Sequence, residues 1–480
     1  MTTTLVRPED HRAEPERHRS APPHHRPAPP RRRLLAALRT PPRIGTSLAL
    51  TLGTAASLTP GLLPRTAAAQ AILTALLVTI ALTVAGIARI IGRRLGFDIN
   101  HRLAAYRIPV ALTGTLMVSG AVVLAQQWQN RLRDAMGVAA VGADHWLRCG
   151  VGAVLIVVVL VGIARGIRWL VRRLGRLRSV GLAVVAALAT QVVLLPTVVD
   201  WRRSADATAN AFVDSTLVQP VSLTRSGSAA SEVSWASLGA EGRKFVAGSP
   251  SRAARVYVGL NSAPDLKSRV ALAIRELDNS GAWNRANLVV MIPTGSGWID
   301  ANAARGLDER FGGDVALLGM QYSQAPSWAT FVFGRSAAEE SARTLFTAVE
   351  QRIAALPHKP RLYIYGQSLG ATAGSALFAD DADQQRRVCA ALWAGPPAGR
   401  VHHGNATILA NSSDPVVQWS PELLWHAPDP AGTRSDAPRP PWIPLLSFVQ
   451  TSADLLTALN PPPGHGHRYG TDQGTAMGNC

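Results

Sequence analysis

Long apolar runs dominate the first 200 residues of the chain. Five stretches of about 18 or more mostly apolar residues follow one another, at approximately 44–63, 68–91, 108–125, 151–171 and 179–199. Runs of this length are typical of transmembrane helices, because a helix satisfies its backbone hydrogen bonds internally where no water is present. The pattern predicts an α-helical transmembrane domain over residues 44–200 with about five spans.

The rest of the chain alternates short, β-rich apolar segments with helical patterns. Helical patterns cover 267–281 and 337–356, and a further helix is expected to open at Ser368. The strand-like segments are 254–260, 287–293, 314–322, 361–366, 389–395, 405–411 and 445–450. Strands alternating with helices predict a mostly parallel sheet with helices on both faces.

Two polar segments flank the membrane domain. The first 33 of residues 1–43 are rich in Pro, His and Arg and nearly free of apolar side chains, which predicts a disordered basic tail. A solvated tail explains these histidines better than a metal site does. Residues 201–241 are expected to form a linker, because the chain is rich in Ser, Thr and Ala from about residue 206 to residue 241. A folded domain is then expected over 242–480.

Positive charge is confined to the membrane half. The formal net charge of +18 and the pI near 11.1 would ordinarily suggest a nucleic-acid partner. However, residues 1–200 hold 25 Arg against 8 acidic residues, whereas residues 201–480 hold 24 basic and 23 acidic residues. The basicity therefore belongs to the membrane region, and no nucleic-acid partner is expected.

The arginines also alternate between the connections of the predicted spans. Ten precede the first span, and the connections at 92–107 and 165–178 are rich in Arg, whereas 64–70 holds only Arg65. Cytoplasmic loops keep the excess of Lys and Arg. The pattern predicts an integral plasma-membrane protein with a cytoplasmic N-terminus and, after five spans, an extracytoplasmic C-terminal domain.

The cysteines predict neither disulfides nor a metal site. Cys149, Cys389 and Cys480 share no close spacing, so no disulfide framework or zinc site is indicated. Cys389 lies in the apolar stretch RRVCAALWAG and is expected to be a buried small hydrophobic residue. No metal and no other cofactor is expected.

One motif carries candidate chemistry. In LYIYGQSLGATAGSALF, residues 362–378, the sequence Gly-x-Ser-x-Gly is centred on Ser368 between a predicted strand and a helix of small residues. This context is that of a nucleophile elbow, in which glycines allow a sharp turn that exposes the serine Oγ. The alternative is a plain turn, which the strand-to-helix context disfavours.

A serine nucleophile needs a base and a carboxylate that orients it, and in α/β-hydrolases both follow the serine in the order acid, then histidine. Asp414 lies directly after a predicted strand, and Asp454 is the reserve candidate. The histidine comes from PPPGHGHRYG, where His467 is slightly favoured and His465 is expected to line the site. The sequence does not separate the two histidines.

An oxyanion hole requires backbone N–H groups that face the attacked carbonyl oxygen. The N–H of Leu369, which follows the nucleophile, is one expected donor. The second is expected from Gly295 or Ser296, in the TGSG loop that follows the predicted strand at 287–293. This loop does not match a phosphate-binding P-loop, because no Gly-Lys-Ser/Thr follows it.

Several stretches jointly resemble the actinobacterial membrane α/β-hydrolases, which combine an N-terminal multi-span region with an extracytoplasmic hydrolase domain. They are SLTPGLLPR at 57–65, PTGSGW at 293–298, QYSQAPS at 321–327, GQSLGA at 366–371, LWAGPP at 392–397 and GHGHRYG at 464–470. The resemblance implies an α/β-hydrolase fold with Ser368, an acid such as Asp414 and one of the paired histidines. It implies no particular substrate. That fold usually closes with a helix after the histidine, where this chain has the polar sequence TDQGTAMGNC.

These observations favour a membrane-anchored serine hydrolase of the esterase, lipase or thioesterase type. A lipid or acyl-ester substrate, such as a cell-envelope acyl group, is expected because the membrane region would hold the site beside a bilayer. An acyltransferase that uses the same triad is an alternative, because acceptor choice depends on the shape of the pocket. A non-catalytic membrane scaffold with a hydrolase-like binding domain is a further alternative. The sequence gives no basis for predicting the oligomeric state.

Overall fold

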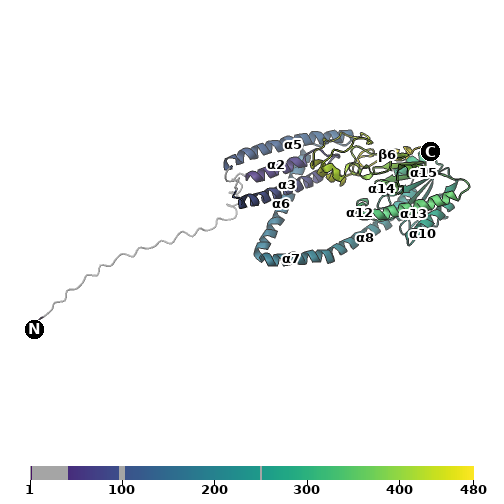
Figure 1. Ribbon diagram of the computed structural model, residues 1–480, viewed down its shortest axis with the longest axis horizontal. Helices are drawn as coiled ribbons and strands as arrows, with labels where there is room; N and C mark the ends of the chain where they lie inside the picture. Colours follow the sequence, from purple (N-terminus) through teal and green to yellow (C-terminus); the bar gives the residue numbers. More distant parts are fainter. Residues whose placement is uncertain (1, 3–41, 97–102, 249–250) are drawn as a thin grey trace.

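The computed structural model describes residue 2 and residues 42–96, 103–248 and 251–480 (Figure 1). A bundle of apolar helices leads, through a long helical arm, into a parallel α/β domain (Figure 1). The expected disordered tail at 1–43 lies outside the described residues, apart from positions 2, 42 and 43.

In the described part of the N-terminal region, four apolar helices pack side by side and form the membrane bundle (Figure 1). They are α2 (Ile44–Ser57), α3 (Ala67–Arg94), α5 (Arg107–Ala135), which follows the short 3₁₀ turn Ala104–Tyr106, and α6 (Ala143–Leu174). Small residues set the spacing between them: a Cβ built on Gly53 would lie 2.7 Å from Val78 Cα, and one on Gly152 would lie 3.0 Å from Ala71 Cβ. Close approach at small residues is typical of helices that associate in lipid.

Four helices in the described part of the chain are long and apolar enough to cross a membrane, one fewer than expected. They are Ala67–Arg94, Ala104–Ala135, Ala143–Leu174 and the compound helix Leu177–Ala211. The first predicted span, 44–63, is helical only in α2, whose 14 residues reach about 21 Å. The helix ends because Pro60 has no N–H to donate and disfavours helical geometry at Thr59.

The fifth predicted run, 179–199, forms an arm that leaves the bundle and returns to the α/β domain (Figure 1). It contains α7 (Arg176–Ala189), a π-helical turn (Thr190–Leu194) and α8 (Leu195–Ala211). The π turn ends two residues before Pro196, which cannot donate a hydrogen bond to the preceding turn. The apolar side chains of the arm are exposed, which is compatible with contact with lipid.

The C-terminal domain is built on a six-stranded parallel sheet with strand order β1-β3-β2-β4-β5-β6. The strands are β1 (Ala254–Val258), β2 (Asn287–Ile292), β3 (Val315–Met320), β4 (Arg361–Gln367), β5 (Ala390–Ala394) and β6 (Ala406–Leu409). The four strands β1, β2, β3 and β5 are buried along their whole length, as expected for a parallel sheet covered on both faces.

Helices cover both faces of this sheet. On one face α10 (Leu266–Asn279), α13 (Arg335–Ala354) and α14 (Leu369–Ser375) pack together, and on the other α11 (Ala301–Arg310) contacts α9 (Gly239–Ala247) and α18 (Asp472–Thr475). This separation follows from right-handed crossovers in a sheet whose strand order reverses between β2 and β3. The shorter helices are α12 (Ser327–Phe333), α15 (Asp381–Arg387), α16 (Pro415–Gln418) and α17 (Leu446–Leu455), with 3₁₀ turns at Ala282–Asn284, Pro397–Gly399 and Pro421–Leu424.

Two sequence predictions about this domain need correction. The segment 445–450, expected to be a strand, begins helix α17, because a short apolar run does not distinguish a strand from a buried helix. The segment 201–241, expected to be a linker, starts inside α8 and then packs onto the domain, where Ser226 and Ser231 each donate a hydrogen bond of 2.7 Å to Glu276.

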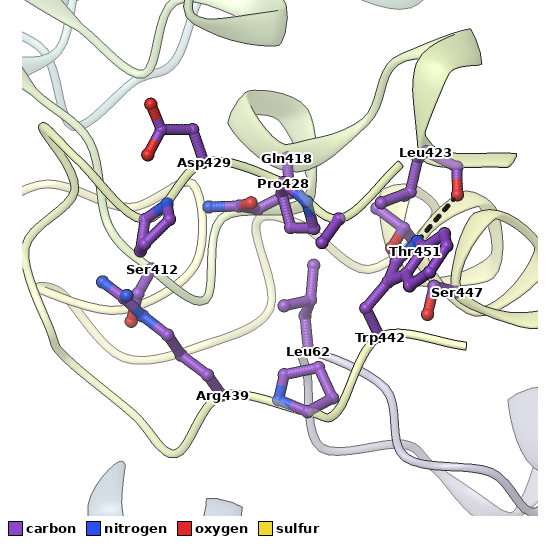
Figure 2. A pocket seen from close by; sticks show the side chains of 13 residues that line it. Leu62, Ser412, Gln418, Leu423, Pro428, Asp429, Arg439, Trp442, Ser447 and Thr451 are labelled. Atoms are coloured by element: carbon purple, nitrogen blue, oxygen red, sulfur yellow. Dashed lines mark hydrogen bonds between the residues drawn. The ribbon is translucent and has the colours of Figure 1, made fainter. Parts of the chain in front are cut away.

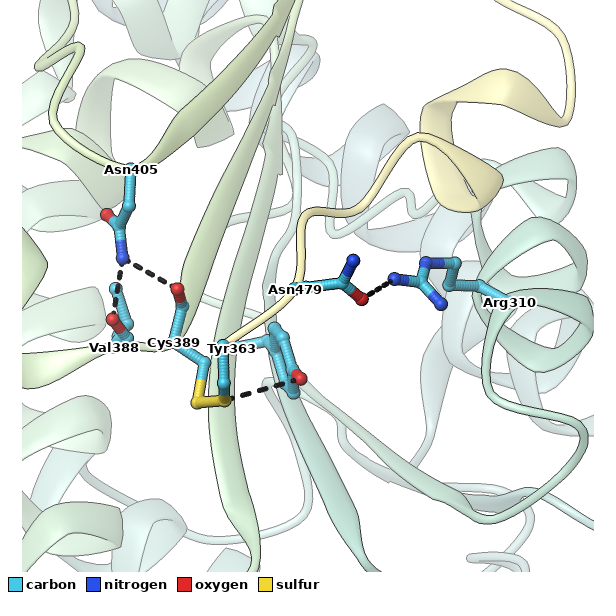
Figure 3. Close-up of a disulfide and its surroundings, with 7 residues drawn as sticks. Arg310, Tyr363, Val388, Cys389, Asn405 and Asn479 are labelled. Carbon is cyan, nitrogen blue, oxygen red and sulfur yellow. Dashed lines mark hydrogen bonds between the residues drawn. A yellow bond between two sulfur atoms is a disulfide. The ribbon is translucent and has the colours of Figure 1, made fainter.

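The last residues of the chain are held against the domain, and the prediction about the cysteines was wrong. Cys389, next to the start of β5, forms a disulfide with Cys480 (Figure 3). Helix α18, which precedes Cys480, packs closely on α11. A Cβ on Gly306 of α11 would lie only 2.1 Å from the Thr471 carbonyl oxygen. The pairing joins positions 91 residues apart, so cysteine spacing gave no sign of it.

Candidate functional site

Ser368 lies in a strained turn between β4 and α14. Its backbone angles are φ 55° and ψ −123°, a region that residues other than glycine rarely enter. The Ser368 N–H donates a 2.9 Å hydrogen bond to the carbonyl of Ala394, at the end of the adjacent strand β5. This conformation turns the chain sharply from the strand into the helix at the serine, as a nucleophile elbow requires.

The two glycines of the motif have no room for a side chain. A Cβ on Gly366 would lie 2.4 Å from the carbonyl oxygen of Gly370, and a Cβ on Gly370 would lie 2.2 Å from the carbonyl oxygen of Ile292. Both contacts are with backbone atoms, which cannot rotate away. The spacing Gly-x-Ser-x-Gly therefore reflects the close packing of α14 against β4 and the end of β2.

Asp414 and His467 form a buried pair beyond the end of β6. Asp414 is fully buried and caps α16, where its Oδ1 accepts a 2.8 Å hydrogen bond from the Val416 N–H. Its Oδ2 lies 2.7 Å from His467 Nδ1. A carboxylate on Nδ1 leaves the other ring nitrogen, Nε2, free to accept a proton.

The serine and the histidine converge on the segment Ala394–Gly395. The N–H of Ser368 binds the carbonyl of Ala394, and the His467 Cε1 lies 2.7 Å from the place that a Cβ would occupy on Gly395. Gly395 has φ +57°, so a side chain there would be strained as well as obstructed. No hydrogen bond between Ser368 Oγ and His467 is present among the described residues, as is common before substrate closes a site.

Tyr469 is a further member of this cluster. Its hydroxyl donates a 2.7 Å hydrogen bond to Asp414 Oδ2, the oxygen that also faces His467. Burial raises the pKa of Tyr469 well above its ordinary value, and the neighbouring Asp414 raises it further. The phenol therefore stays protonated and acts as a permanent donor to the carboxylate. Its place two residues after His467, on the same loop, was the available sequence signal.

His465 belongs to a separate polar cluster. Its Nδ1 lies 3.2 Å from Oδ2 of Asp436, a carboxylate that also accepts hydrogen bonds from the hydroxyls of Ser412 and Ser413. The Ser413 hydroxyl in turn accepts a 2.8 Å hydrogen bond from the Gly466 N–H. His465 thus helps to fasten the loop that carries His467. Asp436 stands in a proline-rich segment, RSDAPRPP, in which the sequence alone offered no reason to select it.

Asp454, the reserve acid, has a different partner. Its carboxylate is fully buried and binds Arg65, with 2.9 Å between Arg65 Nε and Asp454 Oδ1. Its Oδ2 accepts a 2.7 Å hydrogen bond from the Leu62 N–H. The structure therefore pairs Asp454 with the membrane region rather than with either histidine.

The expected oxyanion donors lie at two adjoining turns. Leu369 is the first residue of α14, so its N–H has no acceptor within the helix. The TGSG loop forms a tight turn in which the Thr294 N–H binds the Trp298 carbonyl at 3.0 Å. The Gly295 N–H donates to Ser327 Oγ at 3.2 Å, whereas the Ser296 N–H has no acceptor in the described part of the chain. Of the two candidates in this loop, Ser296 is the one whose N–H is free.

An apolar cavity of about 300 Å³ lies where the α/β domain meets the N-terminal helical region, and it is lined in part by Ser412, two residues before Asp414 (Figure 2). It is lined by Leu62, Ser412, Gln418, Leu423, Ala427, Pro428, Asp429, Pro430, Arg439, Pro440, Trp442, Ser447 and Thr451. Leu62 is the contribution of the membrane region, so this cavity belongs to both parts of the chain. Among the described residues, no group of three His, Cys, Asp or Glu side chains is arranged to hold a metal ion.

The comparisons with known proteins match both halves of the chain. Residues 254–408 and 402–478 match the family model described as "Alpha/beta-hydrolase family". Residues 58–250 match the model described as "Alpha/beta-hydrolase family N-terminus". No curated protein matches the chain.

Proposed function

The chain belongs to the α/β-hydrolase family, and from that premise we propose that it is a membrane-anchored serine hydrolase that cleaves an ester or thioester. One observation carries the proposal: the fold brings a buried Asp414–His467 pair, with 2.7 Å between carboxylate and ring, to the strand end that also binds the strained Ser368. A domain that only binds a ligand has no need for this combination.

In the proposed reaction, Ser368 Oγ attacks the carbonyl carbon of the substrate while its proton passes to His467 Nε2. Asp414 stabilises the resulting imidazolium, and Tyr469 holds the carboxylate in place. The N–H groups of Leu369 and Ser296 bind the negative oxygen of the tetrahedral intermediate. The alcohol or thiol then leaves with the proton from His467, and water hydrolyses the acyl-serine by the same steps in reverse order.

The surroundings of the site support a lipid or long-chain acyl substrate. Large apolar side chains are exposed on both of its sides, with Trp328 65% and Phe333 83% exposed on α12, and Leu456 87% and Leu459 56% exposed after α17. Helix α12 adjoins the oxyanion loop through Ser327, and the carbonyl of Ala458, beside Leu459, accepts a hydrogen bond from the His467 N–H. Apolar residues gathered around a site favour contact with lipid.

Two features support a location of the catalytic domain outside the cytoplasm. Arginines end α3 (Arg93, Arg94) and α6 (Arg172, Arg173) at the bundle end that lies away from the catalytic domain (Figure 1). Excess Arg favours the cytoplasmic side of a membrane. The Cys389–Cys480 disulfide is typical of an oxidising compartment.

Labelling with a fluorophosphonate probe tests the proposal. The full-length protein in detergent is expected to react at Ser368, and Ser368→Ala is expected to abolish labelling without changing the temperature of unfolding. Ser336→Ala, at an exposed serine of α13, is the matched control and should label like the wild type. Absence of labelling in folded wild-type protein would favour a non-catalytic scaffold.

A charged, membrane-impermeant probe tests the location. Intact cells are expected to label as strongly as lysed cells. Labelling that appears only after lysis would place the domain in the cytoplasm.

A further inference from the structure

The loop between α2 and α3, residues 58–66, lies between the membrane bundle and the catalytic domain. On the catalytic side it contacts α17. The Arg65 guanidinium binds Asp454 Oδ1 through Nε at 2.9 Å and Nη2 at 2.8 Å, and the Leu62 N–H binds Oδ2 at 2.7 Å. Both carboxylate oxygens of Asp454 are thus occupied by the α2–α3 loop.

On the membrane side the same loop is held by α5. Trp128 Nε1 donates a 2.9 Å hydrogen bond to the Gly61 carbonyl, and the Arg65 N–H donates a 2.9 Å hydrogen bond to Gln129 Oε1. Arg133 Nη2 donates a 2.8 Å hydrogen bond to the Arg65 carbonyl. The α2–α3 loop is therefore bonded to a membrane helix through its backbone and to the catalytic domain mainly through the Arg65 side chain.

The Arg65–Asp454 pair is enclosed. The side chains of Arg65 and Asp454 are 5% and 0% exposed. Burial raises the pKa of the Asp454 carboxyl above its ordinary value, and the charge of Arg65 opposes that shift. A buried carboxylate that loses its cationic partner is strongly destabilised, so the position of Asp454 depends on Arg65. Gly61 completes the enclosure, since a Cβ there would lie 2.5 Å from Arg65 Nη2.

The α2–α3 loop also reaches the loop that carries the histidine, residues 460–469. Ala458, one turn beyond Asp454, accepts a 2.9 Å hydrogen bond from the His467 N–H. Leu63 is fully buried, and its Cδ2 lies 3.4 Å from the place that a Cβ would occupy on Gly466. The membrane region thus holds the histidine loop at two points. Leu63 packs directly beside Gly466, and Arg65, through Asp454, holds the end of α17 that precedes Ala458.

We propose that Arg65 is a positioning residue for His467, and that the α2–α3 loop makes the membrane bundle a structural part of the catalytic site. By holding Asp454, Arg65 fixes the end of α17 and with it the backbone of the histidine loop. The proposal rests on the role of His467 as the base under the proposed function. It also gives the membrane region a purpose beyond anchoring, for which a single span would suffice.

Two measurements on the full-length protein in detergent test this inference. The first is hydrolysis of a p-nitrophenyl ester by Arg65→Ala, Arg65→Lys and Arg148→Ala. Arg148 is the control, because its ion pair with Asp144 also lies at the catalytic end of the bundle but is exposed. The second is amide hydrogen exchange in peptides from 456–470 and from the elbow at 362–375.

Arg65→Ala is expected to lower kcat about 10- to 100-fold, because a displacement of about 1 Å in a catalytic group costs about that much. The KM should change less than about twofold, since the Arg65 side chain is buried against Asp454. Arg65→Lys keeps the charge and should recover part of the loss, whereas Arg148→Ala should match the wild type. Exchange should rise in 456–470 and stay unchanged in 362–375.

The exchange measurement separates failure of this inference from failure of the proposed function. If wild-type protein is inactive but Arg65→Ala still loosens 456–470 selectively, the proposed hydrolase function fails and the positioning contact stands. Wild-type kcat and unchanged exchange in Arg65→Ala would overturn the inference. An equal rise of exchange in both segments would overturn it too, because Arg65 would then act only on global stability.

Discussion

The turn at Ser368, the proposed nucleophile elbow, and the histidine loop belong to the same proposed site but are built in different ways. The elbow is contiguous: Gly366, Ser368 and Gly370 lie within five residues, and their close contacts are with backbone atoms of the strand-to-helix junction and of β2. The histidine loop is assembled from a distance. His467 depends on Asp414, 53 residues away, and Asp454, near the start of that loop, depends on Arg65, 389 residues away.

The two halves of the proposed site are therefore expected to be disrupted by different kinds of substitution. The elbow depends on close backbone contacts. An added methyl group is therefore expected to disrupt it even when all distant segments keep their positions. The histidine loop depends on hydrogen bonds and ion pairs between separate segments, so it is expected to fail through partners that lie far from the chemistry. A domain with an intact elbow and a displaced histidine loop is expected to keep its fold and lose the proposed activity.

The largest expected effect comes from removing the histidine that faces Asp414. His467→Ala should lower kcat/KM for a p-nitrophenyl ester about 10⁶-fold, because the serine then lacks its base. His465→Ala is the matched variant on the same loop, and it should cost less than about tenfold, because His465 only fastens the loop through Asp436. Equal losses in the two variants would contradict the assignment of distinct roles.

A somewhat smaller effect is expected from a methyl group at the elbow. Gly370→Ala should lower the free energy of unfolding by about 3 kcal/mol, because its Cβ would lie 2.2 Å from the Ile292 carbonyl oxygen and the backbone has to shift. Thermal unfolding of the detergent-solubilised protein measures the loss. Gly334→Ala is the control, since the nearest atom lies 3.4 Å away. Equal unfolding temperatures for the two variants would show that the elbow tolerates the methyl group.

The smallest effect is expected from Tyr469→Phe, which removes one hydrogen bond to Asp414 Oδ2 and keeps the ring. A hydrogen bond to a charged group contributes about 1.5–3 kcal/mol, and part of this is expected to appear as a loss of about tenfold in kcat. Tyr363→Phe, a buried tyrosine on β4 whose hydroxyl faces Cys480, should leave kcat unchanged. A wild-type kcat in Tyr469→Phe would show that the hydrogen bond from Tyr469 to Asp414 does not contribute to the reaction.

Predictability follows the same division as the architecture. The apolar strands of the sheet and the strand-to-helix turn at Ser368 were accessible because periodicity and a local motif record them. Asp414 and the two histidines, His465 and His467, were selected only by their order after the serine. The apolar run at 445–450 was predicted as a strand, whereas it begins a helix, Leu446–Leu455, whose buried residues are Gln450, Thr451 and Asp454 and form no apolar stripe that would indicate a helix. The buried polar face exists to meet Arg65 and its loop, and a local pattern contains no information about that partner.

By itself, the sequence determined the two-part plan of this protein: an apolar helical region and a parallel α/β domain of the α/β-hydrolase family, with an elbow at Ser368. These features depend on hydrophobic periodicity and backbone sterics, which act over a few residues. Only the tertiary structure paired Asp414 with His467, His465 with Asp436, Cys389 with Cys480 and Arg65 with Asp454. Each of these pairs joins side chains that become neighbours only when the sheet, its covering helices and the membrane bundle pack together, because burial, and not sequence distance, selects the partner of a polar group.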